Sequence, residues 1–204
     1  MLPRRFFDRP AVEVAPDLLG RVVEHETSEG LVAVRLTEVE AYEGESDPAS
    51  HAYRGRRPRN ATMYGESGHI YVYFTYGMHF CMNLVCLPPG AASAVLLRAG
   101  DVVGGVELAR ARRGPRVADR DLARGPARLT VALGVGRAED GADGCAADGA
   151  LRVRRGAKAS GEVLTSPRTG VASAAEVPWR FHLAGEPTVS PYRRHVPKRR
   201  GDRS

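Results

Sequence analysis

The sequence predicts a single α+β domain, in which a curved antiparallel sheet is flanked by helices and one β-hairpin protrudes. Apolar and polar residues alternate with a period of two in pairs of neighbouring segments, a pattern typical of antiparallel hairpins. Short stretches around these pairs carry helix start and stop signals. A chain of 204 residues is long enough for one domain with a sizeable core, whereas two domains would each be small.

The N-terminal part is predicted to form short helices followed by a hairpin. Asp8 and two prolines offer helix starts and Gly20 offers a stop, so residues 5–20 are expected to form one or two helical pieces. Residues 21–26 and 31–42 carry valine-rich alternation on either side of a Thr-Ser-Glu-Gly turn, which predicts a β-hairpin.

The second strand of this hairpin carries an acidic residue among apolar ones. By the alternation, Glu40 shares its face with Val34 and Leu36. A carboxylate in that position costs free energy unless it is paired, hydrogen-bonded or used in chemistry. Two interpretations follow: a strand-end glutamate that reaches solvent or pairs with a nearby arginine, or a functional carboxylate.

Residues 43–68 form a long segment without clear periodicity, which predicts either an ordered loop or a disordered insert. Loops of this length are usually functional or disordered. The segment contains His51 and a basic cluster that has no acidic residue among its members, a pattern that favours a polyanionic partner. The cluster consists of Arg54, Arg56, Arg57 and Arg59.

A second predicted hairpin covers residues 68–87 and is the densest aromatic stretch of the chain. Its first strand has one apolar face and one face with two tyrosines. The link to the next apolar run contains Gly77, which supplies the positive φ of a tight turn. Tyr76 and Met78 lie at the tip. Either another part of the fold covers them, or they insert between stacked bases of an opened duplex.

The central part of the chain predicts one more strand and two helices. Residues 94–99 form a short strand that ends near Arg98, which is placed to face the same site. Residues 101–113 are expected to form a helix capped by Asp101. A further helix is expected over residues 126–133, where Arg128 near the N-terminus is placed to contact phosphates.

The C-terminal part predicts less regular structure. Residues 136–149 are expected to be a flexible loop without chemistry, and residues 151–155 and 179–183 late strands. We expect a folded domain of residues 1–191, followed by a disordered basic tail of residues 192–204. Five of the six net positive charges lie in this tail, so the pI near 9.6 is weak support for a polyanionic partner.

Several classes of protein find no support in the sequence. The three cysteines and six histidines lack disulfide or zinc-ligand spacing, so we expect no metal and no cofactor. No apolar run approaches the length of about 18 residues that a membrane span requires, and no signal peptide is visible. We therefore expect a cytoplasmic protein without a membrane partner.

Nine motifs are distributed over nearly the whole chain. In order they are Glu38-Val-Glu-Ala-Tyr42, His51-Ala-Tyr-Arg-Gly-Arg56, Pro58-Arg-Asn60, Tyr71-Val-Tyr-Phe-Thr-Tyr-Gly-Met78, Cys81-Met-Asn83, Val95-Leu-Leu-Arg-Ala99, Arg124-Gly-Pro-Ala-Arg-Leu129, Arg168-Thr-Gly-Val171 and Pro178-Trp-Arg-Phe181. Any one of them is weak, but their order and spacing are specific. Together they resemble the alkyladenine (3-methyladenine) DNA glycosylase family.

The resemblance implies an enzyme that acts on double-stranded DNA containing damaged purines. We expect it to be a monomer and, if the source is bacterial, to be associated with the nucleoid. It makes Glu40 the general base for water, with Arg98 helping to hold that water and the carboxylate. The implied base pocket is lined by Tyr42, His51, Tyr73 and Asn83, and Asn83 would reject guanine. The implied duplex wedge is Tyr76, with Met78 beside it at the tip. The arginines assigned to DNA are Arg54, Arg56, Arg59, Arg128 and Arg168.

The residue types fit this chemistry on physical grounds. Cleavage of an N-glycosidic bond passes through a sugar with oxocarbenium character, so one carboxylate can stabilise the cation and deprotonate water. The only two lysines, Lys158 and Lys198, come late in the chain, which argues against a Schiff-base lyase.

Two alternatives remain open. The first is a non-catalytic DNA-damage-binding or architectural protein that uses the same tip and arginines. The second, much weaker, is a helix-hairpin-helix glycosylase suggested by Leu133-Gly-Val-Gly136.

Overall fold

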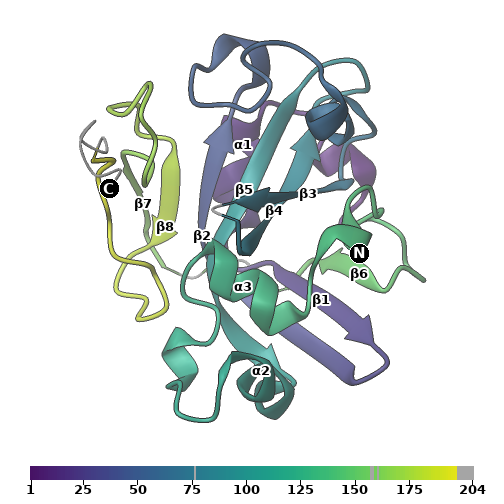
Figure 1. The fold of residues 1–204 in the computed structure, drawn as a ribbon, viewed down its shortest axis with the longest axis vertical. Coiled ribbons are helices and arrows are strands. Elements are labelled where there is room, and N and C mark those ends of the chain that lie inside the picture. Colours follow the sequence, from purple (N-terminus) through teal and green to yellow (C-terminus); the bar gives the residue numbers. More distant parts are fainter. Residues whose placement is uncertain (76, 157–158, 160, 197–204) are drawn as a thin grey trace, which may run out of the picture.

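The longest strand, β2 (Gly30–Tyr42), runs through the middle of an eight-stranded antiparallel sheet (Figure 1). This computed structural model describes residues 1–75, 77–156, 159 and 161–196. The main strand order is β3-β4-β5-β2-β1-β6, and β8 also pairs with β2 and carries β7 on its other side. The remaining strands are β1 (Val22–Thr27), β3 (Ile70–Thr75), β4 (His79–Cys86), β5 (Ser93–Gly104), β6 (Leu151–Arg154), β7 (Val163–Ser166) and β8 (Arg180–Leu183).

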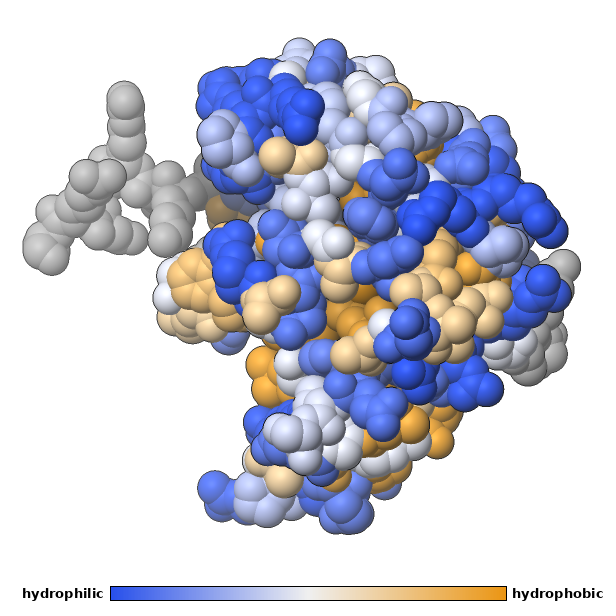
Figure 2. All heavy atoms as spheres, turned by 90° about the vertical axis from the view of Figure 1, so that its right-hand side faces the viewer, coloured by the Kyte–Doolittle hydropathy of each residue, from blue (hydrophilic) through white to orange (hydrophobic). Residues whose placement is uncertain are grey.

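Short helices pack against this curled sheet, which confirms the predicted α+β class. The α-helices are α1 (Ala11–Leu18), α2 (Val106–Arg113) and α3 (Pro126–Leu133), and the 3-10 helices are η1 (Arg4–Phe6), η2 (Gly44–Ser46), η3 (Pro58–Tyr64), η4 (Asp119–Asp121) and η5 (Arg137–Glu139). Each α-helix of the described residues has eight residues, and none is long and apolar enough to span a membrane. The main core lies where α1 and α3 meet the sheet. On the face shown in Figure 2, hydrophilic side chains surround exposed apolar ones.

The apolar face of β2 changes partway along the strand. Val34 and Leu36 lie in the core, but the next core residue of the strand is Val39. The pairing of β2 with β5 shifts register on both sides of Glu38. Since a shift of one residue moves the following side chains to the other face, the prediction that Glu40 shares its face with Leu36 was wrong. Because of the shift, Val39 points into the core and Glu40 points to the opposite face of the strand.

The hairpin of β3 and β4 is confirmed, with Thr75 paired to His79 and Gly77 at a φ of +67°. Met78 is 69% exposed, so the described part of the fold does not cover this side chain. The predicted wedge residue Tyr76 lies outside the described residues.

The loop of residues 136–149 is ordered along the free edge of β3, so the prediction of a flexible loop was wrong. The backbone N–H of Ile70 donates to the carbonyl of Ala142 at 2.8 Å, and the N–H of Gly141 donates to the carbonyl of Ile70 at 2.8 Å. The N–H of Val72 donates to Oδ1 of Asp140 at 2.9 Å. These bonds satisfy an edge strand that would otherwise be open to pairing with another chain.

The helix predicted for residues 101–113 begins later than expected. Strand β5 continues to Gly104, because β-branched Val102 and Val103 favour extended backbone, and Val102 pairs with Val34 of β2. The helix α2 starts only after Gly105, whose φ is +67°. A Cβ on Gly105 would lie 2.0 Å from the carbonyl oxygen of Leu31, so the close approach of the two strands requires glycine at this position.

The segment of residues 43–68 is an ordered loop that carries η2 and η3. It packs on the sheet through a small second core of Ala52, Met63, Tyr64, Tyr71, Val85 and Ala94. Of the two alternatives for this segment, the structure therefore supports the ordered loop. Strand β7 was not predicted, because three of its four residues are exposed and the segment shows no alternation.

Candidate active site

A pocket with a volume of about 400 Å³ opens where β2, β3, β4 and β5 meet two loops. This volume is in the range of small-molecule sites. One loop contributes residues 48–51 and the other contributes residues 169–173. The structure brings together five of the predicted site residues in its lining: Tyr42, His51, Tyr73, Asn83 and Arg98.

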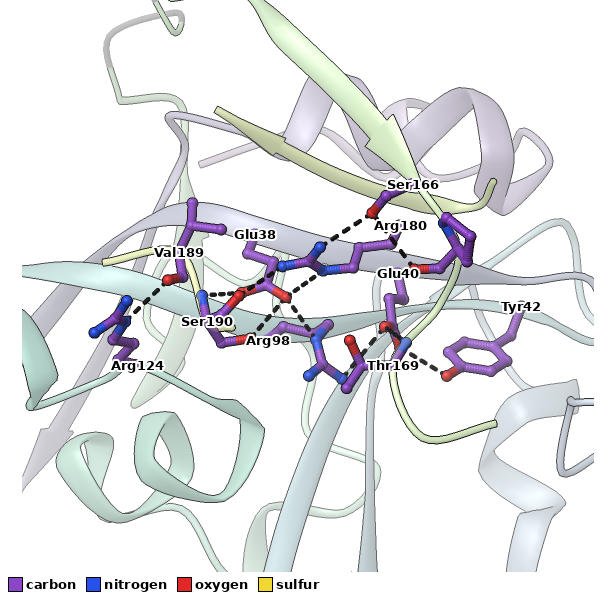
Figure 3. A network of polar contacts seen from close by, with 11 residues as sticks. Glu38, Glu40, Tyr42, Arg98, Arg124, Ser166, Thr169, Arg180, Val189 and Ser190 are labelled. Atoms are coloured by element: carbon purple, nitrogen blue, oxygen red, sulfur yellow. Dashed lines mark hydrogen bonds and ion pairs between the residues drawn. The ribbon is translucent and has the colours of Figure 1, made fainter. Parts of the chain in front are cut away.

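Glu40 lies directly behind this lining and has no exposed surface. Its Oε2 accepts a hydrogen bond of 2.8 Å from the Tyr42 hydroxyl. Its Oε1 accepts a bond of 2.7 Å from the backbone N–H of Thr169 and lies 3.3 Å from Nη1 of Arg98 (Figure 3). All three partners line the pocket, so the carboxylate is one layer from the cavity. The sequence did not predict the part played by Thr169.

A second buried carboxylate, Glu38, supports this arrangement. It accepts bonds from Nε of Arg98 at 2.8 Å and Nε of Arg180 at 2.7 Å. Ser190 adds its backbone N–H at 2.7 Å and its hydroxyl at 2.9 Å (Figure 3). Burial opposes ionisation, but the two arginines outweigh it and hold the pKa of Glu38 below its ordinary value of 4.5. The Glu-x-Glu spacing was the only sequence signal that could have indicated Glu38.

The guanidinium of Arg98 bridges the two carboxylates. Burial alone would lower the pKa of Arg98, but Glu40 and Glu38 raise it above its ordinary value. The side chain is therefore a fixed positive charge at the end of the pocket. The structure rules out a solvent-exposed Glu40, because the side chain is fully buried. Glu40 does pair with an arginine, Arg98, and this pairing is compatible with a functional role for the carboxylate.

One wall of the pocket is aromatic. The rings of His51 and Tyr73 are 4.4 Å apart at 78°, and Nδ1 of His51 lies 3.1 Å from the hydroxyl of Tyr71. Burial, and then the charge of Arg59, lower the pKa of His51 below 6.5. Burial, and then Glu40, raise the pKa of Tyr42 well above 10.0. At neutral pH this wall is uncharged and presents flat rings, which suits stacking on a nucleobase.

Asn83 is held in one orientation within the pocket. It is 5% exposed, and its Nδ2 donates a hydrogen bond of 3.1 Å to the carbonyl of Tyr71. An amide fixed in this way can act as a selective contact, because it cannot rotate freely to suit different ligands.

Four of the five arginines assigned to DNA are exposed: Arg54, Arg56, Arg59 and Arg128. In the part of the chain that the structure describes, none of them makes an ion pair. They are free to contact phosphates.

The assignment of Arg168 to DNA was wrong. Its side chain is 1% exposed and forms an ion pair with buried Asp47. A guanidinium enclosed in this way cannot reach a phosphate. The sequence could not distinguish a buried arginine from a solvated one, because the partner lies 121 residues away.

Among the described residues, no group of three or more His, Cys, Asp or Glu side chains is arranged to hold a metal ion. Cys81, Cys86 and Cys145 are free thiols.

Comparison with known proteins agrees with these features. Residues 5–187 match the family model described as methylpurine-DNA glycosylase (MPG). The chain is 57% identical to a protein of Streptomyces avermitilis over 98% of its length and 95% of the relative. It is 56% identical to a protein of Leifsonia xyli, over 94% of this chain and 92% of the relative. It is 50% identical to a protein of Burkholderia cenocepacia, over 93% of this chain and 91% of the relative. All three carry the name "Putative 3-methyladenine DNA glycosylase". The chain belongs to the methylpurine-DNA glycosylase family.

Proposed function

We propose that this protein is a monofunctional DNA glycosylase of base excision repair. It flips alkylated or deaminated purines out of duplex DNA and hydrolyses the N-glycosidic bond, leaving an abasic site. Its substrates are the class of 3-methyladenine, 7-methylguanine, hypoxanthine and ethenoadenine. The observation that carries this proposal is the buried carboxylate of Glu40, which is hydrogen-bonded by Tyr42 and Thr169 and ion-paired with Arg98, all three of which line an aromatic pocket.

The first step is base flipping. Extruding a nucleotide costs a few kcal/mol, and least for weakly paired bases. The rings of Tyr42, His51 and Tyr73 offset part of this cost by stacking on the flipped base. Tyr76 and the exposed Met78 enter the duplex where the nucleotide has left, and the arginines at 54, 56, 59 and 128 hold the backbone.

In the hydrolysis, a water oxygen bonds to C1′ of the sugar and the C1′–N bond breaks, with its electron pair leaving on the base. One proton of the water passes to Glu40. Oε1 of Glu40 accepts a hydrogen bond from Thr169 and is ion-paired with Arg98, whereas Oε2 has one partner among the described residues, so Oε2 keeps a lone pair for this proton. Since Glu40 has no exposed surface, water reaches it only when a neighbour moves.

The charge state of the base decides what else is required. A purine alkylated on a ring nitrogen is already a cationic leaving group, so it departs without a strong general acid. A neutral base such as hypoxanthine needs a proton or a hydrogen bond as it leaves. The described lining of the pocket contains no lysine, which supports hydrolysis rather than Schiff-base chemistry.

We propose further that residues 1–191 carry the activity of a monomer that works in the cytoplasm, and that residues 192–204 are a basic tail. Of this tail, residues 197–204 lie outside the described part of the chain.

The decisive experiment is a single-turnover excision assay with duplexes that contain hypoxanthine or an N3-alkylated adenine. Wild-type protein should release the base, and strand cleavage should appear only after alkali treatment. Glu40→Gln keeps the shape of the side chain but cannot accept the proton, so we expect a rate lower by about 100-fold or more, with binding retained. Equal rates of base release by wild type and Glu40→Gln would show that Glu40 is not the general base. Tight binding without release by wild type would favour the damage-binding alternative.

A further inference from the structure

Two walls of the pocket are joined by one buried ion pair. Nη1 and Nη2 of Arg168 lie 2.5 Å and 2.9 Å from the two carboxylate oxygens of Asp47. Asp47 directly precedes the wall formed by residues 48–51, and Arg168 directly precedes the wall formed by residues 169–173. The bidentate geometry fixes the direction as well as the distance between the two loops.

The same guanidinium contacts the strand that carries the general base. Nη1 of Arg168 donates a bond of 3.0 Å to the carbonyl of Ala41, the residue between Glu40 and Tyr42. The guanidinium carbon lies 4.7 Å from the ring centre of Tyr42 and 5.2 Å from that of Trp179. Arg168 is thus held by an acid, a carbonyl and two aromatic faces.

This arrangement places the next residue in the chain. The backbone N–H of Thr169 points at Oε1 of Glu40, at 2.7 Å. Because Arg168 is fixed on all sides, the position of that N–H is fixed with it.

Stability alone is a weak reason for such a pair. Replacing a buried ion pair by apolar residues of similar size is often neutral or stabilising. Nε of Arg168 is also buried without a hydrogen-bond partner among the described atoms, which adds a desolvation cost. What an apolar replacement would not supply is the directed link between the loops.

We propose that Arg168, through Asp47, is a positioning residue for the general base: it sets the loop of residues 166–173 so that Thr169 holds Glu40 in its working orientation. This inference rests on the proposed function. It assigns Arg168 to the chemical step and not to DNA binding.

The test separates these two roles with Arg168→Lys, Arg168→Ala and Asp47→Asn. Single-turnover excision at saturating enzyme reports the chemical step, and the Kd for the lesion duplex is measured separately. We expect each variant to lower the saturating rate by about 10- to 100-fold, as for other displacements of a reacting group, while Kd stays within about threefold. Methylguanidinium should partly restore Arg168→Ala. Arg128→Ala is the matched control and should instead weaken binding and reduce the salt slope.

Wild-type saturating rates in folded Arg168→Lys and Asp47→Asn would overturn the proposal. So would a variant that loses affinity and salt dependence but keeps its saturating rate, because that is the behaviour of a phosphate contact. If Arg168→Ala does not fold, the other two variants decide the matter. A wild type that releases no base removes the proposed function and this inference together, whereas an active wild type with unaffected variants removes only the inference.

Discussion

The hydroxyl of Tyr42 donates a hydrogen bond of 2.8 Å to Oε2 of Glu40. The two residues are two apart on β2, so their side chains lie on the same face of the strand. This bond ties the ring that lines the pocket to the carboxylate behind it. One side chain therefore serves both the base pocket and the proposed base of the reaction.

Tyr42→Phe should lower the excision rate at neutral pH by about tenfold, because a hydrogen bond to a charged group is worth roughly 1.5–3 kcal/mol. The ring remains, so affinity for the lesion duplex should not change. The measurement is single-turnover excision at pH 7, with the Kd for the lesion duplex measured separately. Tyr73→Phe is the control, since its hydroxyl does not bond to Glu40, and an equal loss of rate in this control would contradict the explanation.

Glu38→Gln should lower the free energy of unfolding by about 3–5 kcal/mol at pH 7, because it leaves buried Arg98 and Arg180 undercompensated. The pH dependence has a definite sign. Since the pKa of Glu38 is lowered in the folded state, its contribution is present above pH 4.5 and is lost as the pH falls through the folded pKa. Urea unfolding of wild type should show this acid loss, and the variant should show less of it. The exposed Glu13→Gln should behave as wild type, and an unchanged acid slope in Glu38→Gln would refute the assignment.

His51 should titrate below 6.5 and be neutral at pH 7. Burial first, and Arg59 second, lower its pKa. Because the folded protein binds this proton less readily than the unfolded chain, His51 should contribute a loss of stability only below pH 6.5. Long-range proton–nitrogen NMR spectra recorded from pH 5 to 8 would give the pKa directly. Arg59→Gln should raise it part of the way, and a lower or unchanged value in that variant would show that the charge of Arg59 is not a cause of the shift.

Met78→Ala and Tyr76→Ala should slow base flipping and weaken binding to lesion DNA. For Met78, which is 69% exposed, the free energy of unfolding should change by no more than about 0.5 kcal/mol. Stopped-flow fluorescence of 2-aminopurine beside the lesion would report flipping, and thermal melting would report stability. His79→Ala, an exposed change on the other side of the turn, serves as the control. A large loss of stability with normal flipping would mean that the tip is structural.

The sequence predicted those parts of the fold whose signals are local. The hairpin around Gly77 and the helix from Pro126 to Leu133 follow from alternation, turn residues and helix boundaries within a few positions. The β1–β2 hairpin was predicted correctly for the same reason. The face on which Glu40 lies was predicted wrongly, because the register shift arises from pairing with β5, about 60 residues away in the chain.

The candidate site divides in the same way. The side chains that line the pocket, such as His51 and Asn83, were indicated by motifs. The groups that hold the carboxylates were missed, because Thr169 and Ser190 reach them across 129 and 152 residues. Arg168 was assigned to DNA because, in a sequence, a positive charge is usually read as a solvent-exposed one.

The register shifts around Glu38 make residue count along β2 as important as residue identity. A strand that kept every residue but paired with β5 without the shift between Leu36 and Glu38 would alternate regularly from Leu36 onward. Val39 and Ala41 would then turn toward the cavity, and Glu40 would turn toward the apolar interior. Anyone transplanting this site onto another sheet must therefore copy the irregularity in the strand together with the side chains.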